Sequence, residues 1–171
     1  MSQDPGLDFG AFYEHWFDRV YNYARHRTGS AGRADEIVSD TFSRALKAWS
    51  KFDPNKGEAS TWLFSIAFRA VADHYRSESR LLLSRLDESP EPAEAGPAPG
   101  QSLEDLQTRT ELAKALQSLE EQPREIVALR FFAGMTNRAI GGLLGLSENN
   151  VAVILFRSVR KMRLSFPGVE A

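Results

Sequence analysis

The sequence contains no cysteine and only three histidines among its 171 residues. Without thiols the chain cannot form a disulfide or a thiolate metal site, and the composition fits a reducing cytoplasm. The three histidines are scattered along the sequence: His15 and His74 fall within helical patterns among bulky aromatics, and His26 is distant from both in sequence. We therefore expect structural histidines, no metal site and no cofactor.

Long apolar runs are also missing. No hydrophobic segment follows Met1, and no apolar stretch approaches the ~20 residues that cross a bilayer. We expect neither a signal peptide nor membrane insertion, and a cytoplasmic protein. The hydrophobic content of 42% and the length fit one large globular domain or two small ones.

The chain also lacks an excess of basic over acidic residues. The net charge is −2 and the sequence pI is about 6.0, whereas a protein that holds DNA alone usually carries a clear positive excess. A DNA-binding function would therefore require segregated charge, or a partner that supplies most of the phosphate contacts.

Apolar residues recur at helical spacing in three segments of the N-terminal half, 8–27, 33–49 and 61–83, which predicts three amphipathic helices. Ser60 is the expected N-cap of the third helix. The first stripe is unusually aromatic, and we interpret it as core. The buried stripe of the second is expected to comprise Ala34, Ile37, Val38, Thr41, Phe42, Ala45, Leu46 and Trp49.

Two polar faces remain on these helices. The second helix exposes Asp35, Glu36, Ser39, Asp40, Ser43, Arg44 and Lys47, a face that by pattern alone favours simple solvation. The third helix exposes Arg69, Arg76 and Arg80 after a loop that bears two lysines and precedes Trp62. Arginine forks bind phosphates and an aromatic can stack an unpaired base, so this arrangement suits a nucleic-acid strand, although solvated arginines are common.

Residues 86–101 differ in character from the rest of the chain. The segment Ser89–Gly100 has no β-branched, aromatic or basic residue. It cannot bury enough surface to offset ordering, which predicts a flexible acidic linker with a span of roughly 20–25 Å as a coil. The predicted domains are therefore 1–85 and 102–171.

The C-terminal half predicts four helices. The first runs over 102–119, with Ser102 and Asp105 as an imperfect capping box and with Leu106, Ala113 and Leu116 facing the core. The next begins at Gln122-Pro123 and ends at Gly134. The segment 136–163 reads as a short helix, a turn at Gly145 and a longer helix opened by Ser147, which is typical of a helix-turn-helix. The outer side of the last helix carries Arg157, Arg160, Lys161 and Arg163.

Together these features resemble the extracytoplasmic-function group of bacterial RNA polymerase sigma factors in the sigma-70 family. The resemblance lies in ADEIVSDTF (34–42), TWLFSIAFRAVADHYR (61–76) with Ser79 and Arg80, and residues 118–163. It implies an all-α fold of two small domains, a region 2 helical bundle and a region 4 helix-turn-helix, joined by the linker. It also implies core polymerase, promoter DNA and an anti-sigma factor as partners.

The resemblance assigns expected roles to individual residues. It places polymerase docking on Asp35, Glu36, Ser39, Asp40 and Arg44. For −10 recognition and melting, it places the residues near a captured base at Asn55, Lys56, Ser60, Thr61 and Trp62. Trp62 is equally interpretable as a core residue. Contacts to the displaced strand are placed on Arg69, Arg76 and Arg80. It places −35 recognition on Ser147, Glu148, Asn149 and Asn150, with Arg157, Arg160 and Lys161 on the DNA backbone.

The sequence departs from the family pattern in two places. Arg69 stands where the family usually has Asn. Ala152, Val153 and Ile154 replace a Lys/Arg-bearing segment, so Ala152, Val153 and Phe156 are expected to form an apolar patch on the DNA-facing side. Such side chains cannot make bidentate guanine contacts. We hypothesise weak or shape-based −35 readout, or a patch that also binds a protein such as an anti-sigma factor.

Three other functions stay open at this stage. A stand-alone helix-turn-helix regulator that binds duplex DNA as a dimer would leave the N-terminal half unexplained. An enzyme is disfavoured because no phosphate loop, metal cluster or nucleophile–base pair appears. A pure interaction protein, such as an inhibitor of another sigma factor, would bind polymerase without opening DNA.

Overall fold

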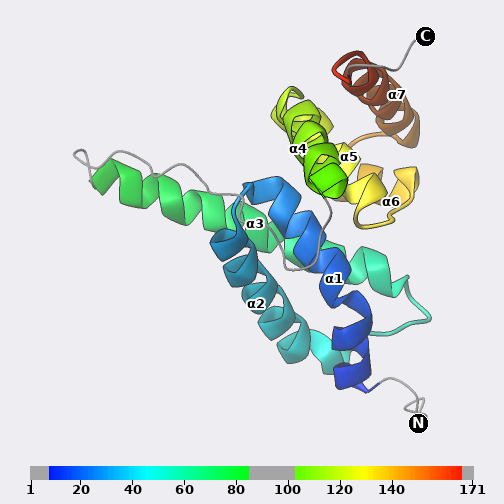
Figure 1. Cartoon of the computed structure of the whole chain (residues 1–171). Helices are drawn as coiled ribbons and strands as arrows, with labels where there is room; N and C mark the ends of the chain where they lie inside the picture. Colours follow the sequence, from blue (N-terminus) through cyan, green and yellow to red (C-terminus); the bar gives the residue numbers. More distant parts are fainter. Residues whose placement is uncertain (1–7, 85–102, 167–171) are drawn as a thin grey trace. The chain divides into compact units, whose positions relative to one another are not determined.

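The computed structural model of the chain describes residues 8–84 and 103–166, and every regular element in these ranges is helical (Figure 1). Compactness divides the chain into two units, Met1–Ala93 and Glu94–Ala171. The predicted acidic linker at 86–101 and the Ser102 end of the capping box lie outside the described residues, so the predicted domain boundaries stay a prediction.

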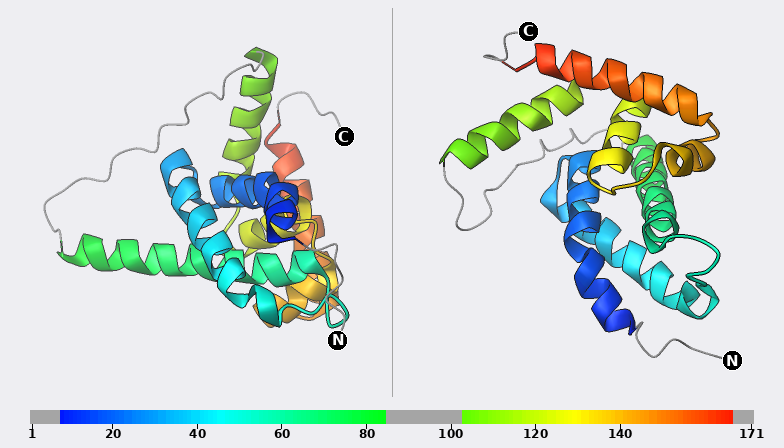
Figure 2. Two further views of the ribbon diagram at one scale, coloured as in Figure 1. Left: turned by 90° about the horizontal axis from the view of Figure 1, so that it is seen from below. Right: turned by 90° about the vertical axis from the view of Figure 1, so that its right-hand side faces the viewer.

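Unit 1 is a bundle of three helices, α1 (Phe9–Thr28), α2 (Ala31–Ala48) and α3 (Ala59–Ser84), with a 3₁₀ turn, η1 (Trp49–Lys51), after α2. Helix α2 packs against both α1 and α3, as the two views of Figure 2 also show. The predicted stripes form the core, in which Val20, Ile37 and Leu63 are almost completely buried. Tyr23 on α1 is buried as well.

The turn between α1 and α2 is fixed by residues that favour it. Gly29 adopts a φ of 68°, and its N–H donates to the carbonyl of Arg25. Ser30 caps α2 by accepting from the N–H of Arg33 at 3.4 Å. The left-handed backbone at Gly29 ends one helix and the serine cap begins the next, so two residues reverse the chain.

Three details of the predicted helices are wrong. Helix α3 begins at Ala59, so Ser60 lies inside it, 8% exposed, and is not its N-cap. Leu46 on α2 is 56% exposed, because the helix projects it away from both neighbours. Ala113 is exposed, and Ala115 and Leu116 are the buried ones among the described side chains of that helix; the side chain of the predicted core residue Leu106 lies outside the described ones.

Unit 2 contains α4 (Leu103–Gln117), α5 (Glu121–Phe131), α6 (Asn137–Leu144) and α7 (Glu148–Leu164). Helix α7 packs on α5 and α6. Ile126, Leu129, Ile140 and Val151 are fully buried between these helices. A cavity of about 300 Å³ with largely apolar walls lies among α4, α5 and α7.

No single helix in the described ranges is long and apolar enough to cross a membrane. Helices α6 and α7 satisfy the length and composition criteria only as a pair, and they are bent by 106° at their junction.

Candidate nucleic-acid interface

Helices α6 and α7 form the predicted helix-turn-helix. Their axes meet at 106°, within the range of about 90–120° for this motif. Gly145 adopts a φ of 70° and donates its N–H to the carbonyl of Gly141. Ser147 begins α7 by accepting from the N–H of Asn150 at 3.1 Å. The glycine turn and the serine cap predicted from sequence therefore both lie where the motif needs them.

Gly141 is the point of closest approach between the turn and α6. A Cβ placed on Gly141 would lie 2.5 Å from the carbonyl oxygen of Leu146, whereas one placed on Gly142 would meet nothing within 4 Å. The adjacent glycines therefore differ in role, because only Gly141 makes room for the backbone of the turn.

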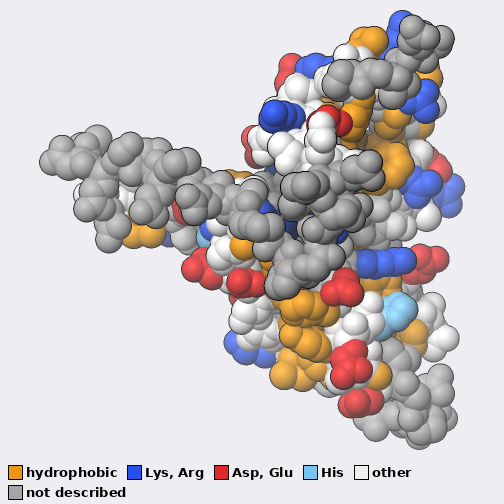
Figure 3. Space-filling view, in the orientation of Figure 1, with side chains coloured by type: hydrophobic (Ala, Val, Ile, Leu, Met, Phe, Trp, Pro, Cys, Tyr) orange, Lys and Arg blue, Asp and Glu red, His pale blue; other side chains and the backbone are white. Residues whose placement is uncertain are grey.

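Helix α7 has two opposite faces. Its buried stripe consists of Val151, Leu155, Ser158 and Met162. On the opposite side Asn149, Val153, Phe156 and Arg160 follow at i, i+4, i+7 and i+11, and all are exposed. The expected exposure of Ala152, Val153 and Phe156 is confirmed, with Val153 40% exposed and Phe156 69% exposed. In Figure 3 apolar and basic side chains lie together in the part of the surface where α7 lies.

The remaining predicted −35 residues lie at the N-terminus and along the second half of this helix. Ser147, Glu148 and Asn150 are exposed at its N-terminus, where Glu148 accepts from Nε of Arg138 at 3.3 Å. Arg157 is exposed on the outer side. Lys161 instead donates its ammonium to the carbonyl of Ser118 at 2.7 Å. Lys161 is thus already engaged within unit 2, while Arg157 is exposed to solvent.

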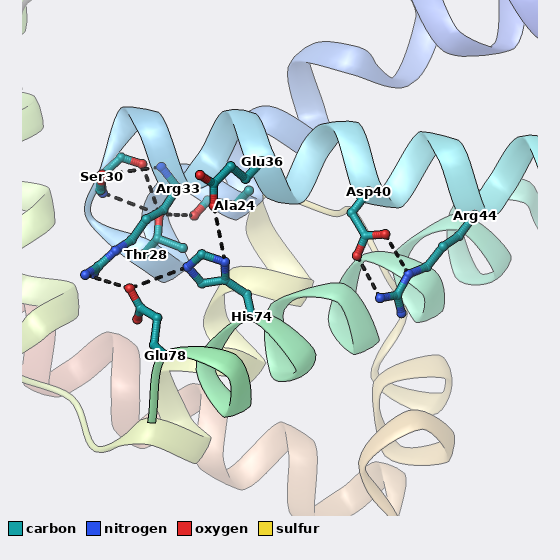
Figure 4. Close-up of polar contacts among 9 residues, drawn as sticks. All are labelled: Ala24, Thr28, Ser30, Arg33, Glu36, Asp40, Arg44, His74 and Glu78. Carbon is teal, nitrogen blue, oxygen red and sulfur yellow. Dashed lines mark hydrogen bonds and ion pairs between the residues drawn. The ribbon is translucent and has the colours of Figure 1, made fainter. Parts of the chain in front are cut away.

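The polar face of α2 is preorganised by one arginine. Arg44 binds Asp40 through two contacts, Nε to Oδ1 at 2.9 Å and Nη2 to Oδ2 at 2.7 Å, which Figure 4 draws. Its Nη1 also reaches Oδ2 of Asp73 on α3 at 2.7 Å. The pKa of Arg44 is raised most by its hydrogen bond to Asp40 and next by its hydrogen bond to Asp73. The other three predicted docking residues, Asp35, Glu36 and Ser39, are exposed on α2.

A second polar cluster joins α2 to α3. His74 lies between two carboxylates, with Nδ1 3.7 Å from Glu36 and Nε2 3.7 Å from Glu78, and Arg33 pairs with Glu78 at 2.7 Å (Figure 4). His74 is half-buried there with both carboxylates beyond hydrogen-bond distance of its ring nitrogens, so its structural role stays a prediction. His15 is exposed and lies edge-on to Trp16 at 5.0 Å. Among the described residues no group of three or more His, Asp or Glu is placed to hold a metal ion.

The arginines of α3 form an exposed line. Arg69, Arg76 and Arg80 are all exposed, and Arg76 lies 3.4 Å from Oδ1 of Asp73. Asp73 therefore contacts Arg44 through one carboxylate oxygen and Arg76 through the other. This link between the α2 face and the arginine line could not be read from either helix alone.

The loop before α3 presents Asn55 and Lys56 to solvent. Asp53 shapes it, because its carboxylate accepts from the N–H of Asn55 at 2.9 Å and lies 3.8 Å from the Lys56 ammonium. Thr61 is half-buried at the start of α3, and the buried Ser60 lies beside it. The two loop side chains are thus the most accessible of the residues predicted near a captured base.

Trp62 belongs to an aromatic cluster that supports this loop. Its ring centroid lies 4.6 Å from Phe52 and 6.1 Å from both Trp49 and Phe12. Phe9 packs edge-on against Trp49 at 5.2 Å. The aromatic stripe of α1 therefore anchors the loop, and Trp62 packs within that anchor while keeping part of its surface exposed.

Comparisons with known proteins agree with this arrangement. Family models of sigma-70 region 2 and sigma-70 region 4 match residues 12–81 and 109–162, which together make up more than half of the chain. The extracytoplasmic-function sigma factor BldN of Streptomyces coelicolor is 30% identical over 93% of this chain and 60% of its own length. The corresponding sigma factor SigL of Mycobacterium tuberculosis is 28% identical over 91% of this chain and 86% of its own. The chain thus spans less than two thirds of BldN.

Two solved structures share the fold. The sigma factor RpoE of Bartonella quintana, in complex with the anti-sigma factor NepR, matches with a TM-score of 0.79 at 20% identity, over 95% of this chain and 99% of that one. CnrH, in complex with the cytosolic domain of CnrY, matches with a TM-score of 0.63 at 25% identity, over 91% of this chain and 85% of that one. With both sigma-70 region models matched in order, and with extracytoplasmic-function sigma factors among its relatives, the chain belongs to the extracytoplasmic-function group of the sigma-70 family of RNA polymerase sigma factors.

Proposed function

We propose that this chain binds core RNA polymerase and directs initiation at promoters that carry −10 and −35 elements, without catalysis of its own. The observation that carries the proposal is the pairing of two surfaces in one chain. Unit 2 presents a helix-turn-helix with an exposed reading face, and unit 1 presents an exposed cationic line beside a preorganised polar face. Residues 1–85 act as region 2, 86–101 as the linker and 102–171 as region 4.

Docking on polymerase is assigned to the polar face of α2. Asp35, Glu36 and Ser39 are exposed, and Arg44 is held by two carboxylates, so little side-chain entropy is lost when this part of the face is bound. We expect the clamp helices of the largest polymerase subunit as its partner, as the family implies. The solvation interpretation of this face becomes secondary.

Recognition of the −10 element is assigned to the loop and α3. Asn55 and Lys56 are exposed at a turn that rests on the aromatic cluster, and Thr61 lies at its edge. Arg69, Arg76 and Arg80 then bind the phosphates of the displaced strand. Unpairing costs a few kcal/mol per base, which capture of an extruded base and cationic contacts offset. Because Ser60 is buried and Trp62 is packed, we assign both to support of the loop.

Recognition of the −35 element is assigned to α7. Ser147, Glu148, Asn149 and Asn150 lie at the end that enters the major groove, where backbone N–H groups and amides reach phosphates and base edges. Arg157 and Arg160 hold the DNA backbone. Lys161 contributes less, because a phosphate contact must compete with its hydrogen bond to Ser118.

An anti-sigma factor is the proposed regulator, and the cytoplasm the proposed compartment. The RpoE structure of Bartonella quintana holds such an inhibitor, and this chain shares its fold. The chain has no cysteine, so a thiol on the chain itself cannot sense oxidants. Inhibition by a partner is therefore the simpler route to control.

The stand-alone regulator is less favoured. It would leave the Arg44 network and the arginine line of α3 without a role, and a net charge of −2 gives little general attraction for duplex DNA. Run-off transcription with purified core polymerase and a genomic promoter library separates the two functions. We expect initiation at a discrete set of promoters only when the chain is added; tight duplex binding without core polymerase and no initiation would overturn the proposal.

A further inference from the structure

The outward stripe of α7 combines three kinds of side chain in one line. Asn149 lies near the N-terminus, Val153 and Phe156 lie in the middle, and Arg160 lies toward the C-terminus, with Arg157 beside it. This line is opposite the buried stripe, so it faces whatever the helix-turn-helix binds. An amide, two apolar groups and two cations along one line can contact the base edges and phosphates of DNA.

Spacing along the helix sets which bases these groups can reach. At about 1.5 Å per residue, Val153 lies about 6 Å beyond Asn149, and Phe156 lies about 4.5 Å beyond Val153. With base pairs stacked about 3.4 Å apart along the DNA axis, groups separated by these distances along the helix can reach neighbouring base pairs. The pattern is therefore continuous across one short stretch of groove.

The chemistry of the stripe selects one kind of base edge. In the major groove only thymine presents a methyl group, whereas guanine presents acceptors that need Arg or Lys. Positions 152–154 carry Ala, Val and Ile and hold no donor for guanine. We propose that Val153 and Phe156 read the C5-methyl groups of neighbouring thymines in the −35 element, next to an adenine bound by Asn149. This inference rests on the proposed function.

Charge on the same face favours DNA over a protein as the occupant. Arg157 and Arg160 are exposed within two turns of the apolar pair, and the only acid in α7 is Glu148, whose carboxylate lies 3.3 Å from Nε of Arg138. The two arginines beside Val153 and Phe156 attract a polyanion such as DNA to this face. Exposed amide side chains at Asn149 and Asn150 supply the polar contacts that a groove floor requires.

Replacement of thymine by uracil tests the inference directly, because it removes only the methyl group. The full chain and core polymerase would first select a promoter from a library with a randomised −35 element. Each thymine of the selected element would then be changed singly to uracil on either strand, and holoenzyme binding measured. We expect two neighbouring positions at which the change weakens binding about fourfold each, the size of one buried methyl-sized group.

Protein variants identify the side chains responsible. Val153→Ser and Phe156→Ser should each abolish the uracil effect at one of the two positions, whereas Val153→Thr, which keeps a methyl group, should retain it. Leu164→Ser is the matched control, because Leu164 is 83% exposed on the same helix about 12 Å beyond Phe156. It should leave both uracil effects unchanged.

Three outcomes are distinguishable. Coupling between a uracil position and Val153 or Phe156 supports the inference. Initiation without any uracil effect, or with effects identical in wild type and both serine variants, overturns it and leaves the proposed function standing. Failure to initiate at any promoter overturns the proposed function, and with it this inference.

Discussion

Substitution of Gly141 by alanine tests the geometry of the helix-turn-helix. The new Cβ would lie 2.5 Å from the carbonyl oxygen of Leu146, well inside the ordinary contact range that begins near 3.4 Å. That oxygen belongs to the backbone of the turn, which the hydrogen bond from the Leu146 N–H to the Gly141 carbonyl at 2.9 Å also fixes. The clash cannot be relieved by rotating a side chain, so α6 and α7 must move apart.

The magnitude follows from two opposing terms. Overpacking of a tight contact costs about 1–3 kcal/mol, and replacement of a mid-helix glycine by alanine returns about 0.5–1 kcal/mol. Gly141→Ala should therefore destabilise unit 2 by about 1–2 kcal/mol. Gly142→Ala is the same chemical change and lowers the conformational entropy of the unfolded chain equally. Its site is exposed and has no neighbour within 4 Å, so this substitution should stabilise unit 2 by about 0.5–1 kcal/mol.

Calorimetry of the full-length variants, with hydrogen exchange of the α5–α7 amides to isolate unit 2, measures both changes. For a unit of this size about 1 kcal/mol shifts Tm by 4–8 °C, so the two variants should differ by at least roughly 6 °C. The Gly141 variant should also lose −35-dependent initiation. Equal stability of the two variants, or a more stable Gly141 variant, would refute the close-approach argument.

Three further predictions concern single contacts. Ser147→Ala removes the N-cap of α7 and should cost about 1 kcal/mol in urea unfolding. A double-mutant cycle between Arg44 and Asp73 should give about 0.2–1 kcal/mol of coupling that falls with salt, because both side chains are more than a third exposed. Arg157→Ala should lower the slope of log K against log salt for holoenzyme binding to −35 DNA by about one, whereas Lys161→Ala should lower it less, because Lys161 already binds Ser118.

Each of these has a clear contrary result. An unchanged urea midpoint for Ser147→Ala would mean that the cap does not stabilise α7. Coupling between Arg44 and Asp73 near zero at low salt would remove the link between α2 and α3. A larger loss of salt slope for Lys161→Ala than for Arg157→Ala would show that the Ser118 contact opens readily and that Lys161 binds phosphate.

The sequence predicted the features that depend on local pattern. Period-3.6 stripes located the helices, and the Gly145 turn and Ser147 cap located the reading helix, because these signals act within a few residues. The exposure of Val153 and Phe156 followed from the same periodicity, since the buried stripe of α7 fixes which side faces outward.

The errors and omissions come from packing between helices. Leu46 continues the α2 stripe by sequence, but neither neighbouring helix reaches it. Serine is a favoured N-cap residue, yet α3 begins at Ala59, two residues before the predicted start, and Ser60 is buried inside it. Asp73 on α3 contacts Arg44 on α2, and that contact depends on how the two helices lie side by side. A single sequence carries no periodic signal for such contacts.

Strand opening at the −10 element tests the central claim most directly. Permanganate oxidises unpaired thymines, so its reactivity on a promoter recovered from the library reports melting. We predict reactive thymines in the −10 region when core polymerase and the chain are both present, and none with either alone. Unreactive −10 thymines in the complete mixture, on DNA that the mixture binds, would contradict the account.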